Sequence, residues 1–197
     1  MTAREPRVAS AANLLGLSRI AATPVVMALL MVPWPGSGIA AAVVFSIAAW
    51  TDFFDGRIAR ARGEVSSLGV FMDLVADKIL VAGVLIAMVA MDLVPAWMAA
   101  TIVIREFVVQ SIRQLAAAEN TVISAAPLGK AKTFATLGGL ALLALASEPS
   151  GGGWTVTVNL AGSWTMVIAT VLTVVSGIAY VRHAWPILLG RGSRADG

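Results

Sequence analysis

The chain has 197 residues, of which 58% are hydrophobic and 13% are charged, whereas soluble domains carry about 25% charged residues. This composition excludes an ordinary soluble domain and predicts one membrane domain over residues 1–197. The absence of cysteine excludes disulfides and thiolate metal sites, and the single histidine, His183, excludes a His-rich site. A bound metal is therefore expected to be a hard cation with oxygen ligands. The net charge of +3 comes with arginines near predicted helix ends, which indicate membrane topology and anion contacts, not nucleic-acid binding.

Six apolar segments are long enough to cross a bilayer, which takes about 20 residues of α-helix. They predict an all-α integral membrane bundle of six transmembrane helices, over about 13–32, 38–58, 67–91, 95–117, 131–147 and 160–185. Residues 2–12 predict a short juxtamembrane helix before the first span.

The distribution of basic residues predicts which side of the cell membrane each loop faces. Lysine and arginine are absent from the predicted outer loops, 33–37, 92–93 and 148–159, and gather on the other side. Both termini are therefore predicted to lie in the cytoplasm. The outer boundary carries tryptophans typical of an interfacial aromatic belt, namely Trp34, Trp97, Trp154 and Trp164. Residues 151–153 are three glycines, which predict a flexible turn because no strand–helix context makes them a phosphate loop.

Four aspartates interrupt the second and third apolar segments, namely Asp52, Asp55, Asp73 and Asp77. A carboxylate near the bilayer centre costs roughly 2.5–3.5 kcal/mol, so these acids need a compensating partner. Their spacings of three and four residues put each pair on one helical face, at the cytoplasmic end of its span. The two helices are thus predicted to present four carboxylates to one cytoplasmic cavity, which suits one or two Mg²⁺ or Mn²⁺ ions.

Glycines and an arginine accompany the acids and favour a diphosphate ligand. Gly56 and Gly69 lie on the same faces, where a missing side chain lets a bulky group approach the backbone. Arg60, one turn beyond Gly56, can offer a guanidinium fork to a phosphate. The alternative is that the acids form buried ion pairs with the nearby cations, but such pairs would not require glycines at the same site; these cations are Arg57, Arg60, Arg62 and Lys78.

Together these residues form the pattern Asp-x2-Asp-Gly-x2-Ala-Arg-x8-Gly-x3-Asp-x3-Asp, filled here by Asp52, Asp55, Gly56, Ala59, Arg60, Gly69, Asp73 and Asp77. The pattern resembles the signature of the CDP-alcohol phosphotransferase family. The resemblance implies six spans, a homodimer, an active site at the cytoplasmic side, and attack of an alcohol on the lipid-side phosphate of CDP-diacylglycerol with release of CMP.

The same resemblance implies roles for the motif residues. Asp52, Asp55 and Asp73 would bind metal and nucleotide in a site for two ions, while Asp77 would be both metal-linked and the general base. CDP-diacylglycerol would contact the residues around the first pair of acids and the second glycine, namely Asp52, Gly56, Arg60 and Gly69.

Basic residues of the fourth and fifth segments predict an acceptor that is itself anionic, such as a phosphate monoester; they are Arg105, Arg113, Lys130 and Lys132. Arg105 and Arg113 are eight residues apart and roughly aligned on one helix, and the lysines follow across a short predicted cytoplasmic loop. Glu106, Gln110 and Arg113 also share one helical face. The alternative is that Arg105 pairs with a core aspartate, while Arg113 and the lysines are only topology signals.

Other segments resemble the phosphatidylglycerophosphate synthase branch of that family, namely residues 13–19, 73–78, 104–106 with Arg113, and 129–133. Two residues depart from the branch, since Leu74 stands where it has proline and Gly16 where it has threonine. The resemblance implies sn-glycerol 3-phosphate as the acceptor.

Alternatives remain within and outside this family. Phosphatidylglycerol or inositol phosphate as acceptor would make the protein a cardiolipin synthase or a phosphatidylinositol phosphate synthase, and an inactive member would only bind nucleotide. A divalent-cation transporter is disfavoured because the acids cluster at one membrane face and the motif has no inverted repeat.

Overall fold

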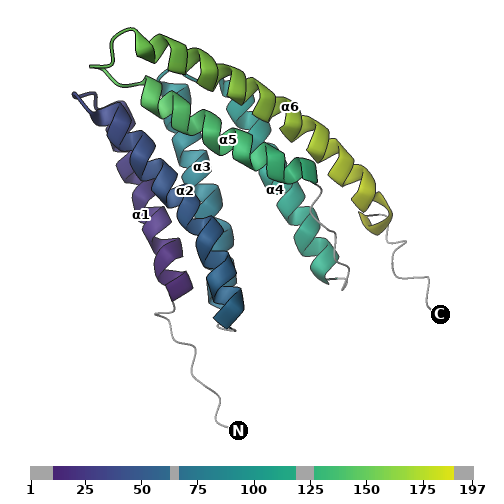
Figure 1. The fold of residues 1–197 in the computed structure, drawn as a ribbon. Coiled ribbons are helices and arrows are strands. Elements are labelled where there is room, and N and C mark those ends of the chain that lie inside the picture. The colour runs from purple at the N-terminus through teal and green to yellow at the C-terminus, as the bar shows by residue number, and fades with distance from the viewer. Residues whose placement is uncertain (1–10, 63–66, 119–126, 189–197) are drawn as a thin grey trace, which may run out of the picture.

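The computed structural model describes residues 11–62, 67–118 and 127–188. Within its helices, the side chains of residues 11–15, 52–62, 67–74, 127 and 186–188 lie outside the description. Over the described residues the chain forms six α-helices and no strand (Figure 1), namely α1 (Ala11–Met31), α2 (Ser37–Arg62), α3 (Ser67–Ala90), α4 (Ala96–Ala118), α5 (Pro127–Ala146) and α6 (Trp154–Leu188). The predicted all-α class is confirmed.

Two helices begin earlier than the sequence predicts. α5 begins at Pro127 instead of residue 131, because proline is well suited to the first helical position, where its missing N–H costs nothing. α6 begins at Trp154 instead of residue 160, so residues 154–159 of the predicted outer loop 148–159 are helical and the non-helical connection is shorter. The polar residues Thr155, Thr157 and Asn159 suggest a loop, yet they lie in the first turns of α6. Of the predicted juxtamembrane helix, residues 2–10 lie outside the description.

The helices pack so that α2, α3, α4 and α5 surround one region. α1 packs against α2 and α3, α5 runs along α6, α2 lies against α5, and α4 lies against α6. Their shared core holds large buried side chains such as Phe45, Leu85, Met88 and Leu143. α5 and α6 approach closely at Gly139, where an added Cβ would lie 2.8 Å from Sδ of Met166.

One carboxylate joins the α1–α2 connection to the α5–α6 connection. Glu148 accepts hydrogen bonds from the backbone N–H groups of Gly36 (2.7 Å), Gly38 (3.1 Å) and Ile39 (3.3 Å). These groups begin α2, where helix N–H groups lack partners within the helix and favour a negative charge. Ser150 also donates to Glu148 through its hydroxyl and its backbone N–H. Hydrogen bonds from the Ser150 hydroxyl first, and then from the Gly36 N–H, lower the pKa of Glu148 to about 2.

The outer surface of the bundle is strongly apolar. Large side chains such as Val156, Ile86 and Ile47 are 71%, 62% and 62% exposed. Among the described residues, Leu128–Ala146 and Trp154–Trp185 are long and apolar enough to cross a membrane by length and composition, and Gly16–Met31 and Ser37–Thr51 are shorter apolar helices. The six-span topology and the side on which each terminus lies stay predictions.

Candidate active site

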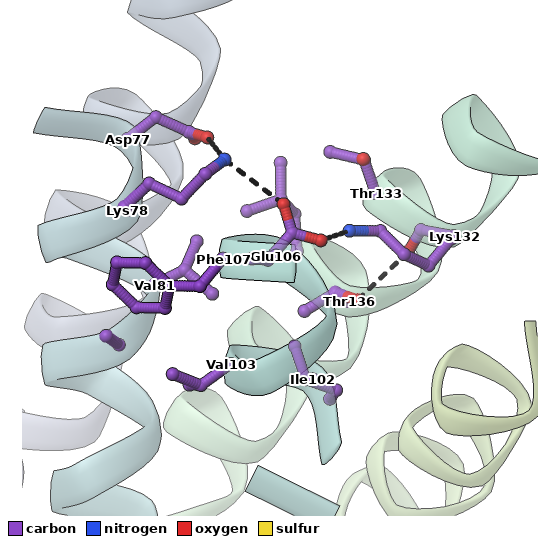
Figure 2. A pocket seen from close by; sticks show the side chains of 12 residues that line it. Asp77, Lys78, Val81, Ile102, Val103, Glu106, Phe107, Lys132, Thr133 and Thr136 are labelled. Carbon is purple, nitrogen blue, oxygen red and sulfur yellow. Dashed lines mark hydrogen bonds and ion pairs between the residues drawn. The ribbon is translucent and has the colours of Figure 1, made fainter. Parts of the chain in front are cut away.

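A cavity of about 530 Å³ lies between α2, α3, α4 and α5. One part of its wall is apolar and aromatic, with Phe45, Trp50 and Phe134. The rest is charged and is lined by Asp77, Lys78, Arg105, Glu106, Arg113, Lys130 and Lys132. A smaller cavity of about 40 Å³ reaches between α3, α4 and α5 past four of these charged groups, Asp77, Lys78, Glu106 and Lys132 (Figure 2). The larger cavity thus combines an apolar wall with a charged wall that carries more positive than negative groups.

The structure brings all four basic residues predicted for the acceptor to this cavity, although they differ in burial. Lys132 is buried, with a side chain only 5% exposed, and the Arg105 side chain is 14% exposed. Arg113 and Lys130 are exposed at the rim. Both lysines lie in the first turns of α5, so Lys130 is helical although the predicted span begins at residue 131. Because both lysines belong to α5, the packing of α5 in the bundle sets their backbone positions relative to α4.

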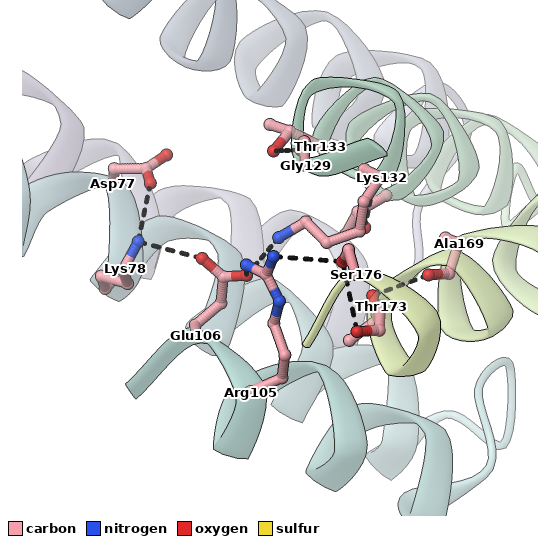
Figure 3. A network of polar contacts seen from close by, with 11 residues as sticks. Asp77, Lys78, Arg105, Glu106, Gly129, Lys132, Thr133, Ala169, Thr173 and Ser176 are labelled. Carbon is pink, nitrogen blue, oxygen red and sulfur yellow. Dashed lines mark hydrogen bonds and ion pairs between the residues drawn. The ribbon is translucent and has the colours of Figure 1, made fainter. Parts of the chain in front are cut away.

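Arg105 is seated between α4 and α6. Its Nη2 donates to Oγ of Ser176 at 3.1 Å, and Ser176 in turn donates to the carbonyl oxygen of Thr173 at 3.3 Å (Figure 3). The side chain crosses α6 at Gly177, where an added Cβ would lie 3.0 Å from Cγ of Arg105. Nη1 donates to Glu106. The partners of Arg105 are thus a serine and a glutamate, and no aspartate pairs with it among the described residues.

Arg113 lies over an aromatic ring, nearer the C-terminal end of α4 than Arg105. Its guanidinium carbon is 5.4 Å from the centroid of the Tyr180 ring, within the range of a cation–π interaction. Tyr180 is itself buried in a small cluster with Val109, Ile112 and Ala184. The Tyr180 ring therefore packs against one face of the Arg113 guanidinium, and Arg113 stays exposed to a ligand.

Asp77 lies at the wall of the cavity with its side chain 42% exposed. Nζ of Lys78 is 3.4 Å from Oδ2 of Asp77 and 3.1 Å from Oε2 of Glu106. Within the part of the chain that the structure describes, Oδ1 of Asp77 has no hydrogen-bond donor. The carboxylate can therefore accept a proton or contact a cation from the cavity.

Glu106, Lys78 and Ser176 belong to this site but were not among the residues predicted for it. Glu106 contacts Lys78 and Lys132, which are 28 and 26 residues away in the chain. Local helical spacing carries no information about such pairs. The sequence does offer weaker signals: Glu106 is an acid in an apolar segment beside Arg105, shares a face with Arg113, and lies in the segment 104–106 that resembles the synthase branch.

The remaining motif residues stand on the helices that border the cavity, but their side chains are not described. Asp52, Asp55, Gly56 and Arg60 belong to α2, and Gly69 and Asp73 belong to α3. α2 and α3 contact each other. Among the described side chains no three potential metal ligands gather, and these include only Asp77 of the four acids. The metal and nucleotide sites therefore stay predictions.

Comparison with known proteins identifies the family. The family profile described as CDP-alcohol phosphatidyltransferase matches residues 9–175. Over 188 residues, 89% of this chain and 95% of the relative, the sequence is 36% identical to a CDP-diacylglycerol--glycerol-3-phosphate 3-phosphatidyltransferase of Bacillus subtilis (strain 168). A protein of Rickettsia bellii (strain RML369-C) with the same name is 34% identical over 86% of this chain and 92% of its own length.

A third relative is described as a probable phosphatidylglycerophosphate synthase of Mycobacterium tuberculosis (strain ATCC 25618 / H37Rv). It is 34% identical over 184 residues, 90% of this chain and 83% of the relative. The matched residues include the acid motif, the basic residues of α4 and α5, and the helices that bring them to one cavity. The chain therefore belongs to the CDP-alcohol phosphatidyltransferase family.

Proposed function

We propose that the protein transfers the phosphatidyl group from CDP-diacylglycerol to sn-glycerol 3-phosphate, giving phosphatidylglycerophosphate and CMP. The observation that carries this proposal is the single cavity in which Asp77 faces Arg105, Arg113, Lys130 and Lys132. A cationic wall suits an acceptor that carries a phosphate, and a nearby carboxylate suits removal of its hydroxyl proton. The names of the relatives from Bacillus and Rickettsia support the same acceptor.

In this reaction the cations bind the acceptor phosphate and leave its hydroxyl free to react. Arg105 and Lys132 are mostly buried, so their charges are weakly screened and their interaction with a phosphate is strong. Arg113 and Lys130 are exposed at the rim and would contribute mainly to capture. Asp77 takes the hydroxyl proton, the hydroxyl oxygen forms a bond to the lipid-side phosphorus, and the bond from that phosphorus to the CMP oxygen breaks.

Two Mg²⁺ or Mn²⁺ ions, when bound, would neutralise charge that develops on the pyrophosphate. The donor set fits such ions, because Asp77 offers a carboxylate with one oxygen without a donor among the described residues and Mg²⁺ prefers oxygen ligands. Asp52, Asp55 and Asp73 add the same donor type from α2 and α3. Asp52, Gly56, Arg60 and Gly69 would hold the nucleotide and its diphosphate.

We further propose that all six helices span the cell membrane, that both termini are cytoplasmic, and that the protein acts as a homodimer. The apolar outer surface and the long apolar helices support membrane insertion. Trp34, Trp97 and Trp154, at or beside the three connections of one end, are 48%, 61% and 44% exposed, as interfacial side chains would be. The lipid tails would stay in the bilayer while the head group reacts in the cavity.

The test is an acceptor panel with purified, reconstituted protein. We expect CMP release from CDP-diacylglycerol with glycerol 3-phosphate in the presence of Mg²⁺ or Mn²⁺, and loss of activity when a chelator removes the metal. Turnover only with inositol phosphate or only with phosphatidylglycerol would overturn the proposed acceptor. Metal flux into liposomes without CMP release would overturn the enzymatic function itself.

A further inference from the structure

The carboxylate of Glu106 contacts three cationic side chains that come from three helices. Oε2 accepts from Nζ of Lys78 at 3.1 Å, and Oε1 accepts from Nη1 of Arg105 at 3.1 Å and from Nζ of Lys132 (Figure 3). Lys78 belongs to α3, Arg105 to α4 and Lys132 to α5. Glu106 is therefore the one group among the described residues through which the cations of these three helices are linked.

These cations need a fixed counter-charge because they are mostly withdrawn from water. The side chains of Lys132, Arg105 and Lys78 are 5%, 14% and 20% exposed, and that of Glu106 is 19% exposed. Like charges held this close repel one another strongly where water is scarce, and a buried cation without a partner is costly. Without the carboxylate, the flexible lysine side chains would turn away from one another toward water.

The contacts with Glu106 leave donors available for a ligand. An ammonium group has three N–H donors and a guanidinium has five. Lys132 uses one of its donors on Glu106. Arg105 uses Nη1 on Glu106 and Nη2 on Ser176, and its buried Nε has no acceptor within the described part of the chain. Glu106 thus orients the two cations without using up their capacity to bind a phosphate.

We infer that Glu106 is a positioning residue for the anionic acceptor: it holds Arg105 and Lys132 in the geometry that receives the acceptor phosphate. This inference rests on the proposed function and adds to it the group that sets acceptor affinity. Lys78 ties the same carboxylate to Asp77 across the cavity. One connected set of contacts therefore positions both the cations that bind the acceptor phosphate and the carboxylate that takes the proton from its hydroxyl.

Two physical effects of Glu106 on an anionic acceptor have opposite signs, which makes the inference testable. Coulomb repulsion alone would make Glu106 weaken acceptor binding, so that replacing it with a neutral residue would strengthen that binding. Positioning has the reverse effect, because disordered or diverging cations bind a phosphate less well. The direction in which the KM for the acceptor moves therefore decides between them.

The experiment compares Glu106→Gln and Glu106→Asp with the wild type, using CMP release to measure the KM for glycerol 3-phosphate and for CDP-diacylglycerol. For Glu106→Gln we expect the KM for glycerol 3-phosphate to rise about tenfold or more. A change of this size corresponds to the loss of one or more charged hydrogen bonds to the acceptor phosphate. The KM for CDP-diacylglycerol should change less than about twofold, because the inference gives Glu106 no part in binding this substrate. Glu106→Asp keeps the charge on a shorter side chain and should give an intermediate rise.

Glu148→Gln is the matched control, because Glu148 is also a buried glutamate that accepts several hydrogen bonds, but at the other end of α5. It should lower the unfolding temperature and leave both KM values unchanged. An unchanged or lower KM for glycerol 3-phosphate in Glu106→Gln would overturn the inference. If Glu106→Gln fails to fold, an unchanged KM in Glu106→Asp would overturn it equally.

Failure of the proposed function has a different readout. A wild type that turns over another anionic acceptor, and not glycerol 3-phosphate, contradicts the proposed acceptor. The same two variants then test Glu106 with the acceptor that is used, and a raised KM for that acceptor alone supports the inference.

Discussion

Under the proposed function, individual side chains of the cavity serve either the reaction or the binding of the acceptor. Asp77 is the one acid of the motif whose side chain the structure describes, and it stands beside Lys78 with much of its surface open to the cavity. Arg105 is held instead by neighbours on two helices. The two residues therefore call for different tests, one of chemistry and one of geometry.

Asp77→Asn should reduce turnover by about 10²–10⁴-fold, the usual contribution of a general base. An amide matches the carboxylate in shape but takes up no proton from the acceptor. Binding of CDP-diacylglycerol should be largely retained, which can be measured by equilibrium binding of the labelled lipid nucleotide. A variant with a near-normal rate of CMP release would show that Asp77 is not the base.

Gly177→Ala should raise the KM for glycerol 3-phosphate about fivefold, equivalent to one hydrogen bond of about 1 kcal/mol. The added methyl group would lie 3.0 Å from Cγ of Arg105 and would push the side chain away from Ser176. Gly153→Ala is the control, since an added Cβ at Gly153 meets nothing within 4 Å. Equal KM values in the two variants would show that contact with α6 does not set the position of Arg105.

At the scale of elements, the beginning of α2 depends on a residue more than a hundred positions later. Glu148 takes the place of a local helix cap by accepting from Gly36, Gly38 and Ile39. The approach requires a glycine, because a Cβ at Gly38 would lie 2.5 Å from the backbone nitrogen of Glu148. One end of the bundle is thereby closed by a single charged side chain.

The lowered pKa of Glu148 predicts how stability depends on pH. Its pKa falls from 4.5 to about 2 on folding, so the folded state favours the ionised form. The stabilisation is fully present above pH 4.5 and is lost as the pH falls from 4.5 toward 2. Glu148→Gln should therefore lower the unfolding temperature of detergent-solubilised protein at neutral pH, and its difference from the wild type should shrink in acid.

The control for this pH series is Asp92→Asn. Asp92 is an exposed acid in the turn between α3 and α4 with φ of 57°, a conformation that asparagine tolerates well. It should follow the wild type at every pH. A Glu148→Gln variant that unfolds together with the wild type from neutral to acid pH would contradict the role assigned to Glu148.

The sequence predicts most helices well and two helix starts poorly, for a physical reason. Apolar runs locate α1 to α4 to within a few residues of 13–32, 38–58, 67–91 and 95–117. Hydropathy alone fails where a helix begins with polar residues. Thr155 bonds to the carbonyl oxygen of Gly152 and lies in a helix, and the first turns of α5 carry Lys130 and Lys132.

At the scale of the whole molecule, the cavity lies where four helices meet, and α6 adds Ser176 as a partner of Arg105. Local spacing predicts that Arg105 and Arg113 are roughly aligned on one helix, and in the structure these two and the lysines of α5 line one cavity with Asp77. Local spacing could not predict Glu106 as their common partner. Its contacts join α3, α4 and α5, and the way these helices face each other is a property of the packed bundle.

Membrane orientation can be tested directly because the chain has no cysteine. A single cysteine in Gly153→Cys, in the α5–α6 connection, should react with a membrane-impermeant thiol reagent in intact cells. A single cysteine in Ala118→Cys, at the end of α4, should react only after the membrane is permeabilised. The reverse pattern would place the cavity on the outer side, and labelling of both in intact cells would contradict the spanning topology.

Because α5 follows α3 and α4 in the chain, the charged side chains of the cavity are synthesised in a fixed order. Lys78 and Glu106 leave the ribosome before Lys132. The Glu106 carboxylate can therefore pair with Lys78 of α3 before Lys132 has been synthesised. A product of stalled translation that ends before Pro127 would carry the aspartates without Lys130 and Lys132, and would therefore lack two of the five basic side chains that line the cavity.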